Sequence, residues 1–144
     1  MADNNDSPRG PRVLIVDDEE DFLDVLVKRL SKRNLRVVPA TRGLEALHIL
    51  SREPFDAVVL DLRMPGLGGM RTLEEIKRVL PAVEVIILTG EADMELAMQG
   101  MELGAFDFVL KPPSVDELLY KIEDATKRTH QNRKKHATEA GRTA

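Results

Sequence analysis

Five side chains that could bind a metal ion or a phosphate follow directly after runs of apolar residues. They are Asp17, Asp18, Asp61, Thr89 and Lys111. A carboxylate beside a packed core costs free energy unless another group pairs with it or makes use of it. If the apolar runs are parallel strands, their carboxyl ends lie along one edge of a sheet, where α/β proteins bind ligands. We therefore expect the five side chains to converge on one site.

Three carboxylates in one site favour a bound cation. They would repel one another, and at least one would stay protonated without a positive charge between them. Hard oxygen ligands suit Mg²⁺, which keeps several of its waters. No histidine lies near the cluster in the sequence, which argues against a zinc or iron site. A lysine and a hydroxyl beside a magnesium-bound carboxylate suit phosphoryl transfer. Asp61, alone after its apolar run, is the expected nucleophile and would form an aspartyl phosphate.

Short apolar runs alternate with segments of helical periodicity, and this alternation predicts the scaffold. Strands are expected at 12–16, 35–40, 55–60, 83–88 and 106–110, each followed by a helix. Pro39 places the second strand at an edge, and Ser114 with Glu117 forms a capping box for the last helix. Strands that alternate with helices form parallel sheets covered on both faces. The expected fold class is α/β, a flavodoxin-like (βα)5 doubly wound parallel five-stranded sheet of order 2-1-3-4-5.

Composition narrows the possible functions. The chain has 144 residues, a net charge of -4 and no cysteine, which excludes disulfides, thiolate catalysis and cysteine-rich zinc sites. The negative net charge argues against nucleic acid as the main ligand. No apolar run approaches the roughly 20 residues of a membrane helix, so we expect a cytoplasmic protein without membrane contact.

The chain divides into three segments by composition. Residues 1–10 are polar and rich in Pro, Gly and Asn, and we expect them to be a disordered leader. Residues 11–127 hold all the apolar periodicity and form the expected domain. Residues 128–144 lose that periodicity and turn basic, so we expect a fraying helix end and a polar tail in which His130 and His136 are solvated.

Four motifs give a resemblance to a known family. "LIVDDEE", "VVLDLRMPGLGG", "VIILTGEAD" and "FDFVLKPP" resemble, in order and spacing, the motifs of the response-regulator receiver domain of two-component signalling, over residues 11–127. The resemblance implies that Asp61 is the phosphoacceptor and Asp18 a direct Mg²⁺ ligand. It also implies that Asp17 acts on the metal mostly through water and that the backbone carbonyl of Arg63 is the third protein ligand.

The resemblance further implies a two-state switch driven by phosphate from a sensor histidine kinase. Thr89 and Lys111 would hold the phosphoryl oxygens, and movement of Thr89 would let Phe108 turn inward. This would remodel the face built from helix 94–105, strand 106–110 and the last helix, which could bind a downstream protein, a histidine phosphotransfer domain or a second copy of the chain. The Lys111–Pro112 bond matches one that is cis in the family.

Two further side chains are expected to tune the lifetime of the phosphoryl group. Arg63 and Glu91 each lie two residues beyond a site residue, Asp61 and Thr89 respectively. In receiver domains these positions flank the route of the attacking water. Our hypothesis is that their opposite charges pair across the mouth of the site and slow hydrolysis.

Other functions remain open from the sequence. If the chain ends at residue 144, it resembles a stand-alone, chemotaxis-regulator-like receiver that signals through a partner and is no enzyme beyond self-phosphorylation and self-dephosphorylation. Otherwise it would be the receiver fragment of a DNA-binding transcriptional regulator. A phosphatase of the haloacid dehalogenase type is a third reading, but those enzymes carry "DxDxT" after the first strand, where this chain has "DDEED".

Overall fold

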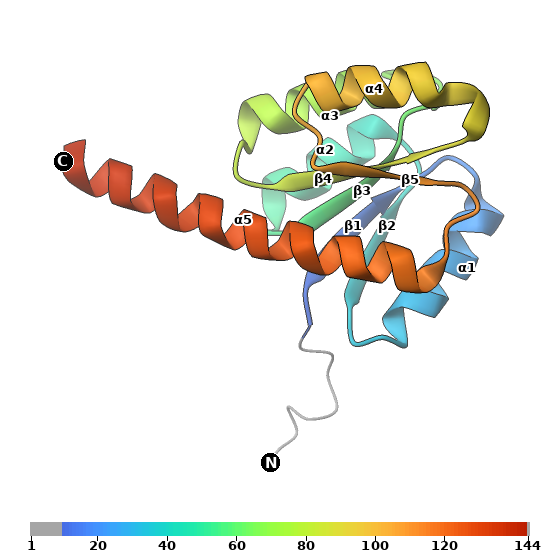
Figure 1. Cartoon of the computed structure of the whole chain (residues 1–144), viewed down its shortest axis with the longest axis horizontal. Coiled ribbons are helices and arrows are strands. Elements are labelled where there is room, and N and C mark those ends of the chain that lie inside the picture. The colour runs from blue at the N-terminus through green and yellow to red at the C-terminus, as the bar shows by residue number, and fades with distance from the viewer. Residues whose placement is uncertain (1–9, 144) are drawn as a thin grey trace, which may run out of the picture.

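The computed structural model describes residues 10–143, in which five strands alternate with five α-helices (Figure 1). The strands are β1 (Arg12–Val16), β2 (Arg36–Ala40), β3 (Ala57–Asp61), β4 (Glu84–Thr89) and β5 (Asp107–Leu110). The helices are α1 (Glu20–Ser31), α2 (Gly43–Arg52), α3 (Gly69–Val79), α4 (Met94–Glu102) and α5 (Val115–Thr143), with a 3-10 turn, η2 (Glu91–Asp93), before α4. Of the expected leader, residues 1–9 lie outside the described residues.

All neighbouring strands pair in parallel, in the order β2-β1-β3-β4-β5. The expected fold class is therefore confirmed, including the edge position of the strand that contains Pro39. The order reverses between β1 and β3, so their carboxyl ends form the point at which open α/β sheets bind ligands.

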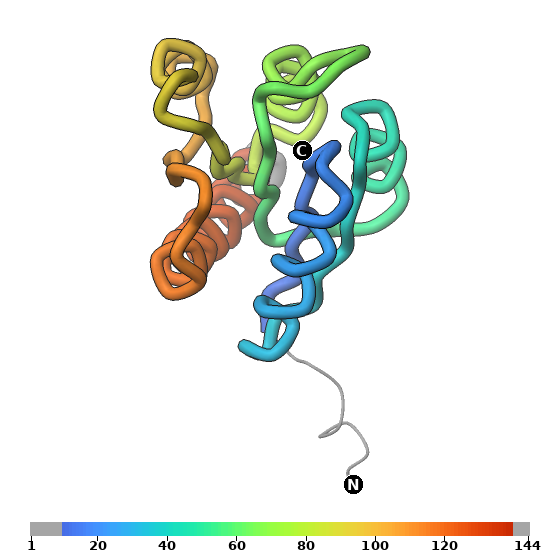
Figure 2. The backbone as a smooth tube through the Cα atoms, turned by 90° about the vertical axis from the view of Figure 1, so that its right-hand side faces the viewer, coloured from blue at the N-terminus to red at the C-terminus, as the bar shows by residue number. Residues whose placement is uncertain are grey.

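The sheet has a core on each face. Helices α2, α3 and α4 cover one face, and α1 and α5 cover the other (Figure 2). Along β3 the side chains alternate between the two cores: Val58 and Leu60 face α2 and α3, whereas Ala57 and Val59 face α1 and α5. Because both faces are buried, the strand reads as a continuous apolar run. Asp61 is the residue at which this run reaches the sheet edge.

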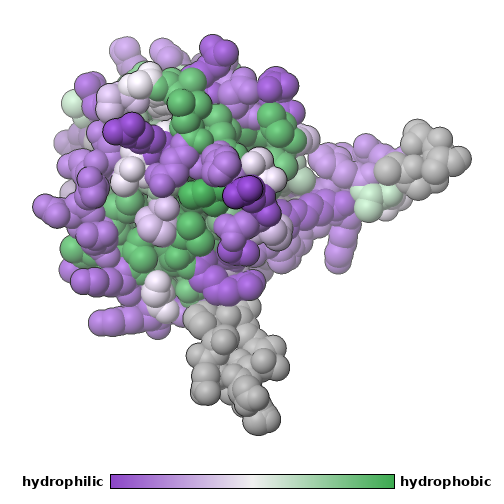
Figure 3. Space-filling view, turned by 180° about the vertical axis from the view of Figure 1, so that it is seen from behind, coloured by the Kyte–Doolittle hydropathy of each residue, from purple (hydrophilic) through white to green (hydrophobic). Residues whose placement is uncertain are grey.

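Helix α5 continues well past residue 127, where the apolar periodicity of the sequence ends and only a fraying helix end was expected. It continues to Thr143 and projects beyond the sheet (Figure 1), so most of the segment expected to be a polar tail is helical. The coloured part of the projecting end displays mostly hydrophilic side chains (Figure 3), and a helix that is mostly polar has no apolar stripe that a sequence pattern could reveal. Among the described helices, none combines the length and the apolar character needed to cross a membrane.

Polar contacts at the amino ends of the strands continue the packing of α5 where its apolar residues end. Glu84, the first residue of β4, is buried and donates its backbone N–H to Thr129 Oγ1 at 3.0 Å. Its carboxylate accepts a hydrogen bond from Asn132 at 3.0 Å and lies 3.3 Å from the Lys77 ammonium. Buried polar groups are stabilised only when they are hydrogen-bonded in this way. These contacts dock α5 about two turns beyond its last buried alanine, Ala125.

A second polar cluster centres on Asp56, just before β3. Its carboxylate accepts the backbone N–H of Arg12 at 2.8 Å and lies 2.7 Å from His130 Nε2 and 3.5 Å from Arg133. Burial alone would raise the pKa of Asp56, but these hydrogen bonds and charges lower it below its usual value. His130 is exposed, but it is bonded to Asp56 and not simply solvated as expected. Arg133 also donates to the carbonyl of Phe55.

Candidate functional site

The carboxyl ends of β1 and β3 bring three carboxylates together. One oxygen each from Asp17, Asp18 and Asp61 lies within 4.8 Å of the others. Asp17 is fully buried and Asp61 is 5% exposed, whereas Asp18 faces solvent. The convergence expected from the strand ends is therefore present for these three residues.

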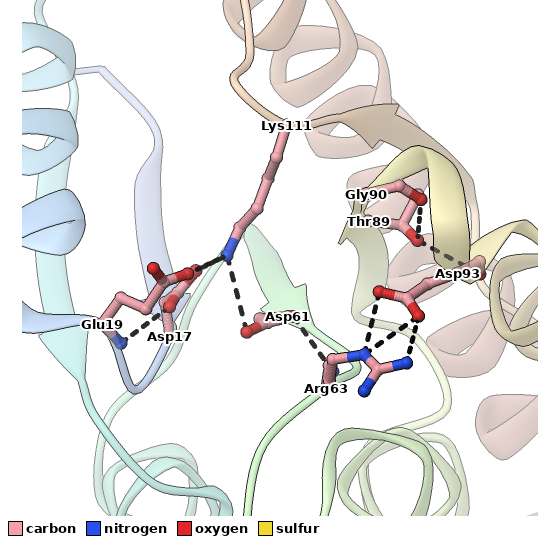
Figure 4. A network of polar contacts seen from close by, with 8 residues as sticks. All are labelled: Asp17, Glu19, Asp61, Arg63, Thr89, Gly90, Asp93 and Lys111. Carbon is pink, nitrogen blue, oxygen red and sulfur yellow. Dashed lines mark hydrogen bonds and ion pairs between the residues drawn. The ribbon is translucent and has the colours of Figure 1, made fainter.

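Lys111, which follows β5, supplies the positive charge for this cluster (Figure 4). Its ammonium lies 2.7 Å from Asp17 Oδ2, 3.0 Å from Glu19 Oε1 and 3.6 Å from Asp61 Oδ2. It also sits 4.7 Å from the centre of the Phe22 ring. Glu19 was missed by the sequence reasoning. It donates its backbone N–H to Asp17 Oδ1 at 2.9 Å. It belongs to the acidic run at 17–21, of which only Asp17 and Asp18 were expected at the site.

The electrostatics of the site leave Asp61 poorly stabilised as a carboxylate. Burial is the largest influence and, with the charges of Asp17 and Asp18, raises the pKa of Asp61 to about 6, although the Arg63 N–H at 3.0 Å and the Lys111 ammonium oppose it. Burial likewise raises the pKa of Asp17 despite its ion pair. For Lys111, burial alone would lower the pKa, but its carboxylate partners raise it well above its usual value. The pocket thus has an excess of negative charge.

The donor set fits a divalent cation. Apart from its ion pair with Lys111, the buried Asp17 Oδ2 has no hydrogen-bond partner among the described residues. This buried carboxylate oxygen, whose one partner is an ammonium, lies beside the carboxylates of Asp61 and Asp18, and Asp18 is open to solvent. Such a site could hold a metal ion that keeps water ligands.

Thr89 reaches the site edge, but its hydroxyl is turned away from the carboxylates. Thr89 Oγ1 lies 3.3 Å from the carbonyl oxygen of Gly90 and 3.3 Å from that of Asp93. Figure 4 shows it on the side of the η2 turn, across from Asp61. The structure therefore places Thr89 near the site without a contact to the expected phosphoacceptor.

Arg63 pairs with Asp93, and the expected pairing with Glu91 is not found. Arg63 Nε lies 2.9 Å and 3.0 Å from the two carboxylate oxygens of Asp93 (Figure 4). Both acidic residues belong to the single 3-10 turn η2. With three residues per turn, side chains two positions apart point in different directions. Glu91 is exposed, whereas the carboxylate of Asp93 is turned toward the loop that follows Asp61.

Phe108 in β5 is half-buried against the core on the α3–α4 face. Its carbonyl oxygen accepts a hydrogen bond from Lys121 at 3.0 Å, and the same ammonium lies 5.8 Å from the centre of its ring. The Lys111–Pro112 peptide bond is cis, as the resemblance implied. Phe108 thus packs against the core on one face of the sheet and contacts Lys121 of α5.

The loop after Asp61 is held close to β3 by a glycine. A Cβ atom on Gly69, the first residue of α3, would lie 2.3 Å from Leu62 Cα and 2.4 Å from the carbonyl oxygen of Asp61. Only glycine allows so close an approach of two backbones. This contact fixes the path of the chain directly beyond the expected phosphoacceptor.

Comparison with known proteins agrees with this geometry. The family model described as the response regulator receiver domain matches residues 13–123. The chain is 39% identical over 119 residues to the transcriptional regulatory protein GlrR of Escherichia coli, and 41% identical over 119 residues to the probable transcriptional regulator ycf27 of Guillardia theta. Each match covers 83% of this chain, but 27% of GlrR and 46% of ycf27. The chain thus spans about a quarter to a half of these relatives.

Solved receiver domains share the fold. A response regulator receiver domain protein from Clostridium thermocellum superposes with a TM-score of 0.81 at 34% identity, over 85% of this chain and 98% of that one. The receiver domain of the Francisella response regulator 1452 gives a TM-score of 0.76 at 29% identity, over 83% and 99%. The chain therefore belongs to the response regulator receiver domain family.

Proposed function

We propose that the domain is a phosphoacceptor switch that takes a phosphoryl group from a sensor histidine kinase onto Asp61. The observation that carries the proposal is the position of Asp61: it ends the central strand β3, beside an acidic pair and 3.6 Å from a lysine ammonium. A carboxylate whose pKa is raised to about 6 is still mostly ionised at neutral pH and can act as a nucleophile.

The transfer forms one bond and breaks one bond. An Asp61 oxygen attacks the phosphorus of a phosphohistidine, the phosphorus–nitrogen bond breaks, and the imidazole leaves with the electron pair. The Lys111 ammonium, already 3.6 Å from Asp61 Oδ2, can stabilise the negative charge that develops on the phosphoryl oxygens. Asp17, Asp18 and the backbone carbonyl of Arg63 would hold Mg²⁺, which would neutralise negative charge on the transferring group.

Phosphorylation would then be read out by Thr89 and Phe108. The Thr89 hydroxyl would leave the carbonyls of Gly90 and Asp93 and donate to a phosphoryl oxygen. Phe108 would follow into the vacated space and change the α4–β5–α5 face. That face is the proposed docking site for an output protein, a histidine phosphotransfer domain or a second copy of the chain. Arg63 and Glu91, at the mouth of the site, are proposed to set the lifetime of the phosphoryl group.

Two outputs are compatible with this switch. Because the chain spans only part of relatives described as transcriptional regulators, we propose the receiver part of a DNA-binding regulator as the second candidate beside a stand-alone receiver in the cytoplasm. Turnover of external phosphate esters is not proposed, because the candidate nucleophile ends β3 and does not follow β1.

Intact mass spectrometry after incubation with acetyl phosphate and Mg²⁺ tests the proposal. The wild type should gain the mass of one phosphoryl group, and Asp61→Asn should gain none. Asp18→Asn keeps the nucleophile but removes a metal ligand, so it should be labelled more slowly. Equal labelling of the wild type and Asp61→Asn would contradict the proposal.

A further inference from the structure

Asp93 is tied to the site by two separate groups. The two oxygens of its carboxylate lie 2.9 Å and 3.0 Å from Arg63 Nε. Its backbone carbonyl oxygen lies 3.3 Å from the Thr89 hydroxyl. The Asp93 carboxylate is 14% exposed and the Arg63 side chain is 71% exposed. The arginine thus approaches the ion pair from the solvent side, whereas the aspartate side chain is mostly shielded at the η2–α4 junction.

These contacts form a chain from the phosphoacceptor to the switch residue. Arg63 donates its backbone N–H to Asp61 Oδ1 at 3.0 Å and its guanidinium to Asp93. Asp93 in turn accepts the Thr89 hydroxyl and receives no other ion pair among the described residues. Loss of the Arg63–Asp93 ion pair would therefore hold the η2–α4 junction less firmly. The Asp93 carbonyl, which accepts the Thr89 hydroxyl, belongs to this junction.

We propose that the Arg63–Asp93 ion pair is a latch that keeps Thr89 turned away from Asp61 until a phosphoryl group competes for Arg63. This inference rests on the proposed function. A phosphoryl group on Asp61 would bring up to two negative charges. Arg63 is only two positions further along the chain. Arginine forms bidentate contacts with phosphate as well as with carboxylate, so its guanidinium can exchange Asp93 for the phosphoryl group.

Release of the latch has a defined consequence. Without Arg63, the Asp93 carboxylate loses its charge partner, and the junction can shift with its carbonyl away from Thr89 Oγ1. The Thr89 hydroxyl, left with the Gly90 carbonyl as its one remaining acceptor, can then turn toward the phosphoryl oxygen. Asp93 is on this view a positioning residue: it acts on the switch through Thr89 and touches no reacting atom.

Beryllofluoride, which mimics a phosphoryl group on a carboxylate, is the probe that measures the latch. Its affinity in the presence of Mg²⁺ should rise about two- to fivefold in Asp93→Ala, the range expected for the loss of one exposed ion pair. Arg63→Ala should tighten binding less, because it also removes a charge that attracts the probe. The matched control is Glu95→Ala, which removes an exposed carboxylate from the first turn of α4, two residues beyond Asp93, and should leave the affinity unchanged.

Two further readouts separate positioning from a loss of stability. The NMR signals of Thr89 in probe-free Asp93→Ala should move toward their positions in the beryllofluoride-bound wild type. The affinity change in the double variant Arg63→Ala/Asp93→Ala should differ from the sum of the single changes, since both remove one interaction. Asp93→Asn, which keeps the shape of the side chain, gives the same comparison if Asp93→Ala unfolds.

The outcomes distinguish this inference from the proposed function. If the wild type binds beryllofluoride but both Asp93 variants bind it like Glu95→Ala, or more weakly, the latch is wrong and the switch proposal stands. If the wild type itself fails to bind the probe, the phosphoacceptor proposal fails and the latch fails with it.

Discussion

Replacement of Asp61 by asparagine should stabilise the folded protein in metal-free buffer at neutral pH. Asparagine has nearly the same shape and keeps an oxygen that can accept the Arg63 N–H now bonded at 3.0 Å. What it removes is a charge that is buried beside Asp17 and Asp18. A site kept for function at the expense of stability should show this behaviour.

The magnitude follows from the raised pKa of Asp61. An increase from 3.8 to about 6, at about 1.4 kcal/mol per pKa unit, corresponds to about 3 kcal/mol. Between these two pH values the folded state holds the proton more tightly than the unfolded state, so the stability of the wild type falls as pH rises through this window. The advantage of Asp61→Asn should be complete above about pH 7 and should disappear toward pH 4.

Urea unfolding of both proteins, at about pH 7.5 and about pH 4.5 in EDTA, measures this difference. Asp18→Asn is the control, since it removes an exposed carboxylate from the same cluster and should give a much smaller gain. Added Mg²⁺ should stabilise the wild type by mass action and narrow its gap to Asp61→Asn. A gain of the same size at both pH values would refute the electrostatic explanation, as would the absence of any gain at about pH 7.5.

Three further predictions concern packing and charges at the site and at the opposite edge of the sheet. Gly69→Ala should lower the free energy of unfolding by more than about 2 kcal/mol, because its Cβ would meet Leu62 Cα at 2.3 Å; urea unfolding measures the loss, and an unchanged midpoint would contradict the close approach. Asp56→Asn should cost about 2 kcal/mol at neutral pH. Because burial is outweighed by the hydrogen bonds from Arg12 and His130, which lower the pKa of Asp56, the cost should fade as pH drops below 3.8; a cost that persists in acid would count against the ionic contribution. Lys111→Met should raise the pKa of Asp61 further, measured by titration of its side-chain carbon by NMR, and a lower value would show that the lysine does not stabilise the carboxylate.

The sheet and most of the site could be predicted because both depend on local patterns. Parallel strands buried on both faces must be apolar along their length, so a carboxylate such as Asp61 at the end of one marks the sheet edge. The three acids and Lys111 then meet because parallel strands end on the same side. No detailed knowledge of side-chain packing is needed for this step.

What could not be predicted depends on side-chain directions and on polar packing. Asp93, and not Glu91, meets Arg63 because of the tight η2 turn, and helical periodicity alone does not reveal such a turn. The second half of α5 packs through Thr129 and Asn132, which a search for apolar periodicity treats as solvent-exposed. The resting orientation of Thr89 likewise depends on carbonyl acceptors that leave no mark in the sequence.

The most direct test of the phosphoacceptor role is to locate the acyl phosphate chemically. The protein is incubated with acetyl phosphate and Mg²⁺, treated with borohydride, which reduces an aspartyl phosphate to homoserine, and then digested and sequenced by tandem mass spectrometry. We predict homoserine at position 61 and unmodified Asp17 and Asp18. Homoserine at either of those two positions, or at none of the three in protein shown to be folded, would contradict the assignment of Asp61.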